Sequence, residues 1–173
     1  PVDENFDRTV VYVVDHDHAG AVGVVLNRPG AEPLPEPLDR WTPLLSDPAI
    51  LYSGGPVAPE ALLALGIARA GAESENLIIG RVRSVDLSAD PALIAPDLDG
   101  LRVFTGYSGW GPGQLDGEIT AGAWIVLDAK DEEQPARRVE LAHALVEGHE
   151  LLELQVRHLE RYRRRSSKWR TCC

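Results

Sequence analysis

The chain has 173 residues, of which 44% are hydrophobic and 25% are charged, and its formal net charge at pH 7 is -10. This length is typical of one globular domain, and no run of 18 or more apolar residues is present to cross a membrane. The negative charge argues against unspecific nucleic-acid binding by the body of the protein. Because neither a secretory signal nor a disulfide framework is visible, we expect a cytoplasmic protein.

Two apolar, β-branched runs near the start of the chain predict a hairpin. The runs are Val10–Val14 and Ala21–Leu26, and the polar stretch DHDHAG at 15–20 is expected to form the turn between them. Both runs are almost continuously apolar, so we expect them to be covered on both faces and to lie near the centre of a sheet. The sequence NRP at 27–29 ends the second strand, because proline cannot donate to a ladder.

The next part of the chain is rich in proline and predicts shorter elements. Six prolines between positions 29 and 48 predict a loop with at most short helical turns. Leu51-Tyr52 predicts a brief strand that runs into SGGPV at 53–57, and Asn76–Arg83 predicts another strand. The run Ala61–Ala68 is compatible with either a strand or a helix.

Two helices and two strands are expected further along. The sequence SADP at 88–91 is typical of a helix start, and this helix should end before Pro96. Leu101–Phe104 predicts a strand, residues 112–121 predict a short helix, and Trp124–Leu127 predicts a returning strand. Alternating elements of this kind indicate a mixed sheet with a few short helices.

The sequence changes character after residue 129, so we divide the chain into a domain at 1–129 and a helical, basic segment at 130–173. Apolar residues recur there at intervals of three and four, which predicts an amphipathic helix packed on the body or on another subunit. The stripe consists of Val139, Ala142, Leu145, Val146, His149, Leu152, Val156 and Leu159.

Charge is unevenly distributed along the chain. Residues 157–173 hold seven basic residues and one acid, a net charge of +6, whereas residues 1–156 carry 10 basic and 26 acidic residues, a net charge of -16. The basic tail is either a solvated terminus or a contact for an acidic partner. Cys172 and Cys173 are adjacent and do not fit a prenylation box.

The most unusual stretch is RVFTGYSGWGPGQL at 102–115. A phosphate-binding P-loop needs a Gly-Lys-Ser/Thr ending, which is missing after Gly113, and the glycine spacing does not fit a dinucleotide fingerprint. A nucleophile elbow around Ser108 would need glycine where Trp110 stands. The stretch therefore indicates a tight strand-to-helix connection, with a ligand- or partner-binding loop as the alternative.

Histidines and aspartates alternate in the predicted turn at 15–18. His16 and His18 could share one side of an extended backbone, but a metal site would need ligands from elsewhere in the chain. We therefore interpret this turn as surface polarity and expect neither a metal nor a cofactor. Arg8 and Asn27 adjoin apolar strands and need partners, so we expect Arg8 to pair with Asp15, Asp128 or Glu118, or both residues to line a small polar pocket.

Three blocks occur in order along the chain: NFDRTVVYVVDHDHAGAVGVVLNRP at 5–29, SGGPV at 53–57 and RVFTGYSGWGPGQLDGEITAGAW at 102–124. Their order and spacing resemble the YqgE/AlgH family of bacterial proteins over residues 3–128. Members of that family usually begin with a further strand, which we expect to be missing here. Residues 131–173 depart from the family's C-terminal sequence pattern.

The resemblance implies a compact α+β sandwich or barrel-like sheet with flanking helices. It implies no established enzymatic activity. Regulatory roles in gene expression have been suggested for some members. We therefore expect an α+β fold with a mixed, mainly antiparallel or barrel-like sheet, short flanking helices and the C-terminal amphipathic helix.

Three functions remain open. The first is a non-catalytic protein that binds a protein partner or small ligand, with regulation of gene expression as its role. The second is a hydrolase that uses Ser108 or Ser53 with a histidine from the 16–18 turn. The third is nucleic-acid binding through the 157–173 tail. We favour the first and expect no membrane contact. The candidate ligand- or partner-binding residues are Arg8, His16, Asn27, Gly54, Gly55, Gly106, Tyr107, Ser108, Trp110 and Gln114.

Overall fold

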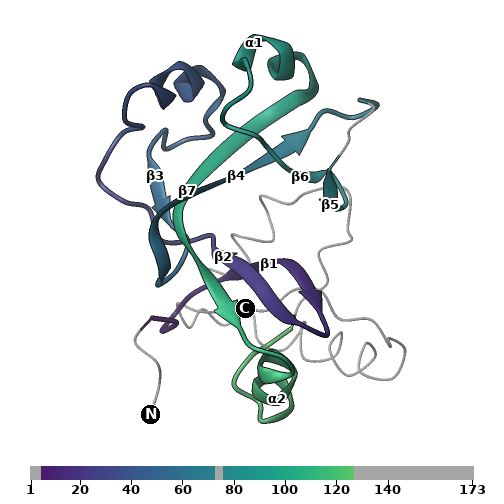
Figure 1. Ribbon diagram of the computed structural model, residues 1–173. Helices are drawn as coiled ribbons and strands as arrows, with labels where there is room; N and C mark the ends of the chain where they lie inside the picture. Colours follow the sequence, from purple (N-terminus) through teal and green to yellow (C-terminus); the bar gives the residue numbers. More distant parts are fainter. Residues whose placement is uncertain (1–4, 73–75, 127–173) are drawn as a thin grey trace, which may run out of the picture.

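A single curved sheet organises the protein (Figure 1). The computed structural model describes residues 5–72 and 76–126. The strands follow the order β1-β2-β7-β4-β6-β5, and β3 pairs with β7 beside this path. Only the β3–β7 pair is parallel among the described strand pairs. The strands are β1 Val11–Asp17, β2 Gly20–Val25, β3 Leu51–Ser53, β4 Val57–Ala68, β5 Leu77–Ile79, β6 Val82–Ser84 and β7 Leu98–Trp110.

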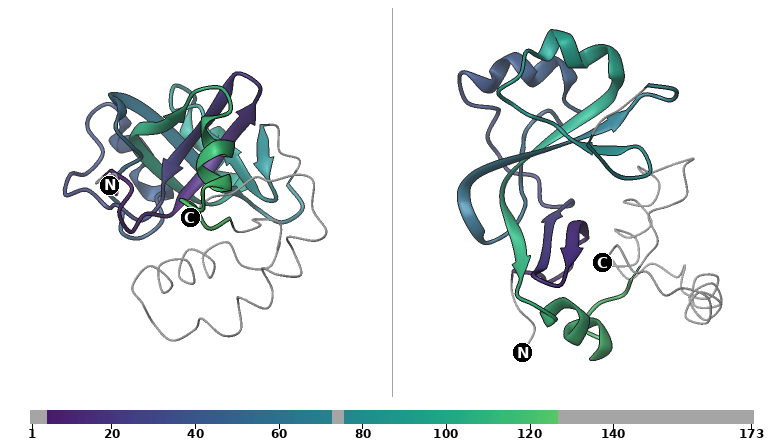
Figure 2. Two further views of the ribbon diagram at one scale, coloured as in Figure 1. Left: turned by 90° about the horizontal axis from the view of Figure 1, so that it is seen from below. Right: turned by 45° about the vertical axis from the view of Figure 1, so that its right-hand side comes forward.

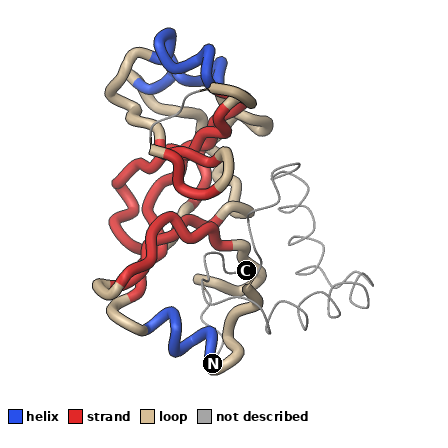
Figure 3. The backbone as a smooth tube through the Cα atoms, turned by 90° about the vertical axis from the view of Figure 1, so that its right-hand side faces the viewer, coloured by secondary structure: helices blue, strands red, loops and turns tan. Residues whose placement is uncertain are grey.

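Short helices lie at two ends of this sheet, as Figure 3 shows. They are the 3-10 helices η1 Leu38–Leu44 and η2 Ala95–Asp97 and the α-helices α1 Pro91–Ile94 and α2 Gln114–Thr120. The fold is thus α+β with a mainly antiparallel, nearly closed barrel-like sheet, which confirms the expected class. The predicted amphipathic helix at 139–159 lies outside the described residues. Within the described part of the chain, no helix is long and apolar enough to cross a membrane.

Strand β7 connects the two halves of the sheet (Figure 2). It pairs with β4 from Leu98 to Tyr107 and with β2 from Ser108 to Trp110. The prediction of a short strand that ends at Phe104 and is followed by a glycine turn was therefore wrong, because the strand continues for six more residues. Gly106 permits this continuation, since it adopts φ +65°, a conformation that is unfavourable for other residues.

The predicted hairpin is present, but its turn is shorter than expected. β1 and β2 extend to Asp17 and Gly20, so only His18 and Ala19 connect them, and the Asp17 carboxylate accepts a hydrogen bond from the Ala19 N–H at 2.7 Å. β1 also lies at the end of the strand order rather than near its centre. Its apolar residues are nevertheless buried on both faces, because separate side-chain clusters cover the two sides of β1.

Four other predicted elements can be compared with the structure through their backbone pairing or capping. The ambiguous run at 61–68 is a strand, since it belongs to β4 and pairs with β7. The single strand predicted at 76–83 is wrong, because a turn at Gly80, with φ +58°, divides it into β5 and β6. Of the strand predicted at 124–127, Trp124 and Ile125 have no strand pairing and Val126 forms a β-bridge, whereas Leu127 lies outside the described residues. The predicted helix start at 88–91 is confirmed, because the Asp90 carboxylate caps α1 by accepting from the Ala92 N–H at 2.9 Å.

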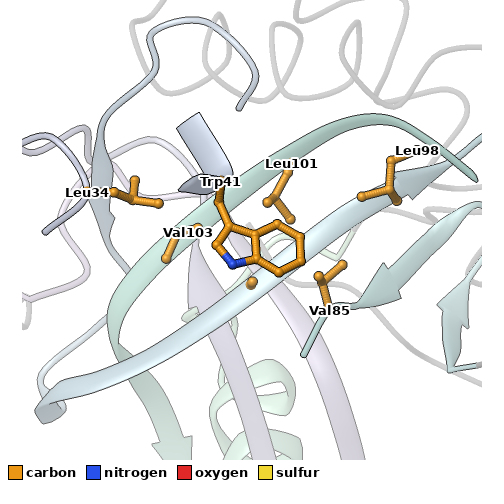
Figure 4. Close-up of a cluster of buried hydrophobic side chains, with 7 residues drawn as sticks. Leu34, Trp41, Val85, Leu98, Leu101 and Val103 are labelled. Atoms are coloured by element: carbon orange, nitrogen blue, oxygen red, sulfur yellow. The ribbon is translucent and has the colours of Figure 1, made fainter. Parts of the chain in front are cut away.

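The proline-rich loop contributes the largest side chain of one buried cluster (Figure 4). Trp41 of η1 is fully buried against β4 and β7, and its indole N–H donates to the Leu87 carbonyl oxygen at 3.1 Å. The adjoining loop is held locally, because both the N–H and the hydroxyl of Ser88 donate to Asp86. These bonds stabilise the charged carboxylate and lower the pKa of Asp86 from its usual 3.8.

Candidate functional site

Two glycine-containing segments cross at close range in the middle of the sheet. Gly54 and Gly55 follow β3, and they lie against Gly106 and Ser108 of β7. The Gly54 N–H donates to the Thr105 carbonyl oxygen at 2.8 Å, and the Gly54 carbonyl oxygen accepts from the Val25 N–H at 2.9 Å. The crossing therefore joins β2, β3 and β7 through one residue without a side chain.

Ser108 belongs to this crossing rather than to an open site. Its side chain is fully buried, and its hydroxyl donates to the Gly54 carbonyl oxygen at 3.1 Å. Tyr107, the preceding residue, is half-buried and packs in an apolar cluster with Phe104. The structure thus brings together the candidates Gly54, Gly55, Gly106, Tyr107 and Ser108, but as packed backbone and core.

Asn27 fastens the start of β1 to the end of β2. Its side-chain oxygen accepts from the Val10 N–H at 2.8 Å, and its amide nitrogen donates to the Arg8 carbonyl oxygen at 2.9 Å. Arg8 takes part through its backbone, at the positive φ of 53°, and its side chain is exposed. Within residues 5–72 and 76–126, none of the ion pairs involves Arg8, so its expected pairing with Asp15 or Glu118 was wrong, and Asp128 lies outside these ranges.

Replacing Asn27 by alanine is expected to lower the free energy of unfolding by about 1–3 kcal/mol, because two backbone groups lose their partners. Arg8→Ala provides the control, since it leaves the Arg8 carbonyl in place and should change stability by less than about 0.5 kcal/mol. Urea unfolding followed by circular dichroism measures both variants. Equal losses in the two variants would contradict the assigned role of Asn27.

His16 connects the first hairpin to α2 and does not join His18. Its Nε2 atom lies 3.4 Å from the Asp116 carboxylate, and its side chain is 19% exposed, whereas that of His18 is 97% exposed. In the described ranges no three His, Cys, Asp or Glu side chains gather as ligands for a metal ion. His16 therefore forms a contact between β1 and α2.

The segment that follows β7 builds a polar anchor inside an aromatic cluster. The Glu118 carboxylate accepts from the indole N–H groups of Trp110 at 3.0 Å and Trp124 at 2.8 Å, both on the same oxygen. Its second oxygen accepts from the Gln114 amide at 2.9 Å, and the oxygen of that amide accepts from the Gly111 N–H at 3.0 Å. Each of these groups therefore fixes the orientation of the next.

Three aromatic rings pack around this anchor. Phe6 stacks on Trp110 with ring centroids 5.7 Å apart, and Trp124 meets both rings edge-on at 5.4 and 5.9 Å. Such separations are favourable for aromatic pairs and leave the rings in mutual contact. Trp124 packs against the core and remains half-buried.

An exposed apolar side chain adjoins Trp124 in the chain. Ile125 is 54% exposed, whereas its chain neighbours Trp124 and Val126 pack partly buried against the core. We use the name aromatic patch for Ile125 together with the partly buried Phe6, Ile119, Trp124 and Val126.

Sequence reasoning found Trp110 and Gln114 of this region but missed the residues that organise it. Glu118 carries a weak signal, since it follows Gln114 by four residues on a predicted helix and can therefore contact it. Phe6 is separated from Trp110 by more than a hundred residues, and no local pattern indicates their contact.

The curved, mainly antiparallel sheet, the glycine crossing and the anchored aromatic cluster together define a small α+β protein with a barrel-like sheet. A family model described as AlgH-like matches residues 2–142. The chain therefore belongs to the AlgH-like family, in agreement with the resemblance seen in its sequence. The match reaches residue 142, beyond residue 128, where the resemblance in the sequence ends.

Several bacterial proteins are similar to this chain in sequence or structure. A UPF0301 protein of Rhodococcus jostii is 46% identical over 79% of this chain and 71% of its own length, and one of Mycobacterium leprae is 45% identical over 74% and 66%. A Corynebacterium diphtheriae crystal structure matches with 31% identity and a TM-score of 0.66, covering 69% of this chain and 65% of that protein. The AlgH protein of Pseudomonas aeruginosa, a solution structure, has 30% identity and a TM-score of 0.57, covering 90% and 87%.

Proposed function

We propose that the protein acts without catalysis, by binding a protein partner through the aromatic patch. The observation that carries this proposal is an exposed Ile125 beside Trp124, whose indole is held in place by Glu118. Tryptophan and other large apolar side chains supply much of the binding energy at protein interfaces, and a pre-fixed ring loses little conformational entropy on binding. A regulatory role in gene expression, in the cytoplasm, would be exerted through this partner.

The alternative of a hydrolase has less support. Ser108 is buried and donates to a backbone carbonyl, and within the described residues His16 lies against Asp116 rather than beside a serine. A nucleophile needs a base within about 3.2 Å and access to substrate. The third alternative, nucleic-acid binding by residues 157–173, concerns residues outside the described ranges.

Ile125→Asp is expected to abolish partner binding with little effect on folding, because a charge at the centre of an apolar interface must be desolvated. The immobilised full chain would be exposed to a lysate of Rhodococcus jostii, and retained proteins would be identified by mass spectrometry. Leu93→Asp is the matched control, since Leu93 is 76% exposed on α1 and lies outside the patch. The proposal fails if Ile125→Asp retains the same proteins as the wild type and Leu93→Asp.

Ser108→Ala tests the hydrolase alternative. We expect it to leave any ester hydrolysis by the purified protein unchanged and to cost about 1 kcal/mol of stability, since one hydrogen bond is lost and the Gly54 carbonyl keeps its backbone partner. Hydrolysis of a chromogenic acetate ester, compared between wild type and variant, is the measurement. Loss of a turnover that the wild type possesses would instead favour the enzyme.

A further inference from the structure

Arg102 is a half-buried arginine in the middle of β7. Two other arginines beside the sheet, Arg69 and Arg81, both pair with the carboxylate of Asp99. For Arg102, in contrast, no carboxylate lies within ion-pair distance in the part of the chain that the structure describes. Arginine side chains are seldom withdrawn from water without a partner, so the position of this guanidinium indicates a role beyond packing.

Two neighbours fix the guanidinium of Arg102 but use few of its donors. Its Cζ atom lies 4.8 Å from the centre of the Tyr52 ring, and Phe104 packs against the same ring at 5.9 Å. One N–H group donates to the Leu26 carbonyl oxygen at 3.4 Å, which is long for a hydrogen bond. A guanidinium carries five N–H donors, so most of them remain available to a ligand. The stacked ring holds the planar group in one orientation.

The hydroxyl of Tyr52 is a second donor beside this cation. Tyr52 is 4% exposed, and because its hydroxyl is neither hydrogen-bonded to another described residue nor enclosed, the oxygen belongs to that exposed part. Apolar side chains adjoin the same ring, since Leu26 and Ile50 pack half-buried in the cluster that contains Tyr52. A fixed cation, a hydroxyl donor and an apolar surface therefore occur together.

We propose that Arg102 and Tyr52 bind the carboxylate of a small apolar acid, whose body packs on Leu26 and Ile50. The guanidinium offers parallel N–H groups that match the two oxygens of a carboxylate, and the hydroxyl adds one further donor. A phosphate group, with a larger charge and three acceptor oxygens, would need more donors than these two side chains supply. Burial of the apolar body adds to the affinity. The aromatic rings of the aromatic patch belong to a different cluster, so this inference is independent of the proposed partner site.

Sodium benzoate tests this proposal, with benzamide as its uncharged counterpart. The two compounds share an aromatic ring and differ in the carboxylate, so only benzoate should bind. On the isotope-labelled full chain, we expect millimolar benzoate to shift the Nε–H signal of Arg102 and the amide signals of Leu26 and Tyr52 along a saturating curve. Equal shifts with benzamide, or no saturable shift with benzoate, would overturn the proposal. Tighter binding of acetate or inorganic phosphate than of benzoate would also overturn it, because it contradicts the assigned class of ligand.

Two variants assign the binding to the two side chains. Arg102→Gln keeps a donor for the Leu26 carbonyl oxygen but removes the charge, and it should weaken benzoate binding by at least about thirtyfold. Tyr52→Phe keeps the ring under the guanidinium and removes only the hydroxyl, and it should weaken binding by about fivefold. Unchanged binding by either variant would overturn the proposal.

Arg40→Gln is the matched control for unspecific attraction of anions. Arg40 also donates to backbone carbonyl oxygens, those of Leu87 and Ser88, but it lies exposed on η1. This variant should bind benzoate as tightly as the wild type. Equal losses in Arg40→Gln and Arg102→Gln would show that benzoate responds to the overall charge of the protein, and the proposed site would then be wrong.

Discussion

Gly54→Ala is expected to lower the free energy of unfolding by about 3 kcal/mol or more, enough to unfold a protein of ordinary stability. A Cβ atom on Gly54 would collide with the Gly106 carbonyl oxygen and would also lie 3.1 Å from the Phe104 Cβ. The colliding atom belongs to the backbone of β7 and cannot rotate away. Any shift of β7 would also stretch the bonds that Gly54 makes to Thr105 and Val25.

The informative control is the same substitution at a glycine with free space. Nothing lies within 4 Å of a Cβ built on Gly117 in α2, so Gly117→Ala should raise stability by about 0.5–1 kcal/mol through helix propensity. Two glycine-to-alanine changes are thus expected to act with opposite sign. Chemical unfolding measured by tryptophan fluorescence compares them, and a Gly54→Ala protein as stable as wild type would show that the crossing is not rigid.

The parts of the fold that sequence could predict are those with a local cause. The apolar runs of the first hairpin, the Asp90 cap before Pro91 and the helix after the glycine loop all depend on residues a few positions apart. The barrel-like sheet was predicted from the resemblance to a known family. The errors have a different origin: β7 extends to Trp110 because Gly106 can take a positive φ and pass Gly55, a residue about fifty positions earlier.

The candidate site was only partly predictable for the same reason. Asn27 was correctly expected to need polar partners, but these are two backbone groups, and no side-chain pattern indicates them. Ser108 was singled out by its glycine neighbours, and those glycines permit the close approach that buries its hydroxyl. Trp110 was found through the glycine stretch, whereas its contact with Glu118 becomes apparent only when the chain turns back after β7.

Glu118→Gln is expected to be the most damaging isosteric change in the aromatic cluster, with a loss of about 2–3 kcal/mol. The N–H donors that converge on the two carboxylate oxygens include those of Trp110, Trp124 and Gln114, and an amide offers only one oxygen. If that oxygen faces Trp110 and Trp124, the new NH₂ group faces the NH₂ of Gln114. Gln114 cannot relieve this by turning over, because its own oxygen already accepts from the Gly111 N–H.

Exchanging the two side chains should restore the network. In the double variant Glu118→Gln with Gln114→Glu, the amide oxygen at position 118 accepts from both indoles and its NH₂ donates to the new carboxylate at position 114. That carboxylate still accepts from the Gly111 N–H, so every donor again has an acceptor. We expect the double variant to recover most of the stability lost by Glu118→Gln, as measured by urea unfolding, and the indole N–H resonances of Trp110 and Trp124 to return toward their wild-type positions. In this account of the anchor, the pattern of donors and acceptors, rather than the identity of either residue, holds the two tryptophans in place. A double variant no more stable than Glu118→Gln would refute it.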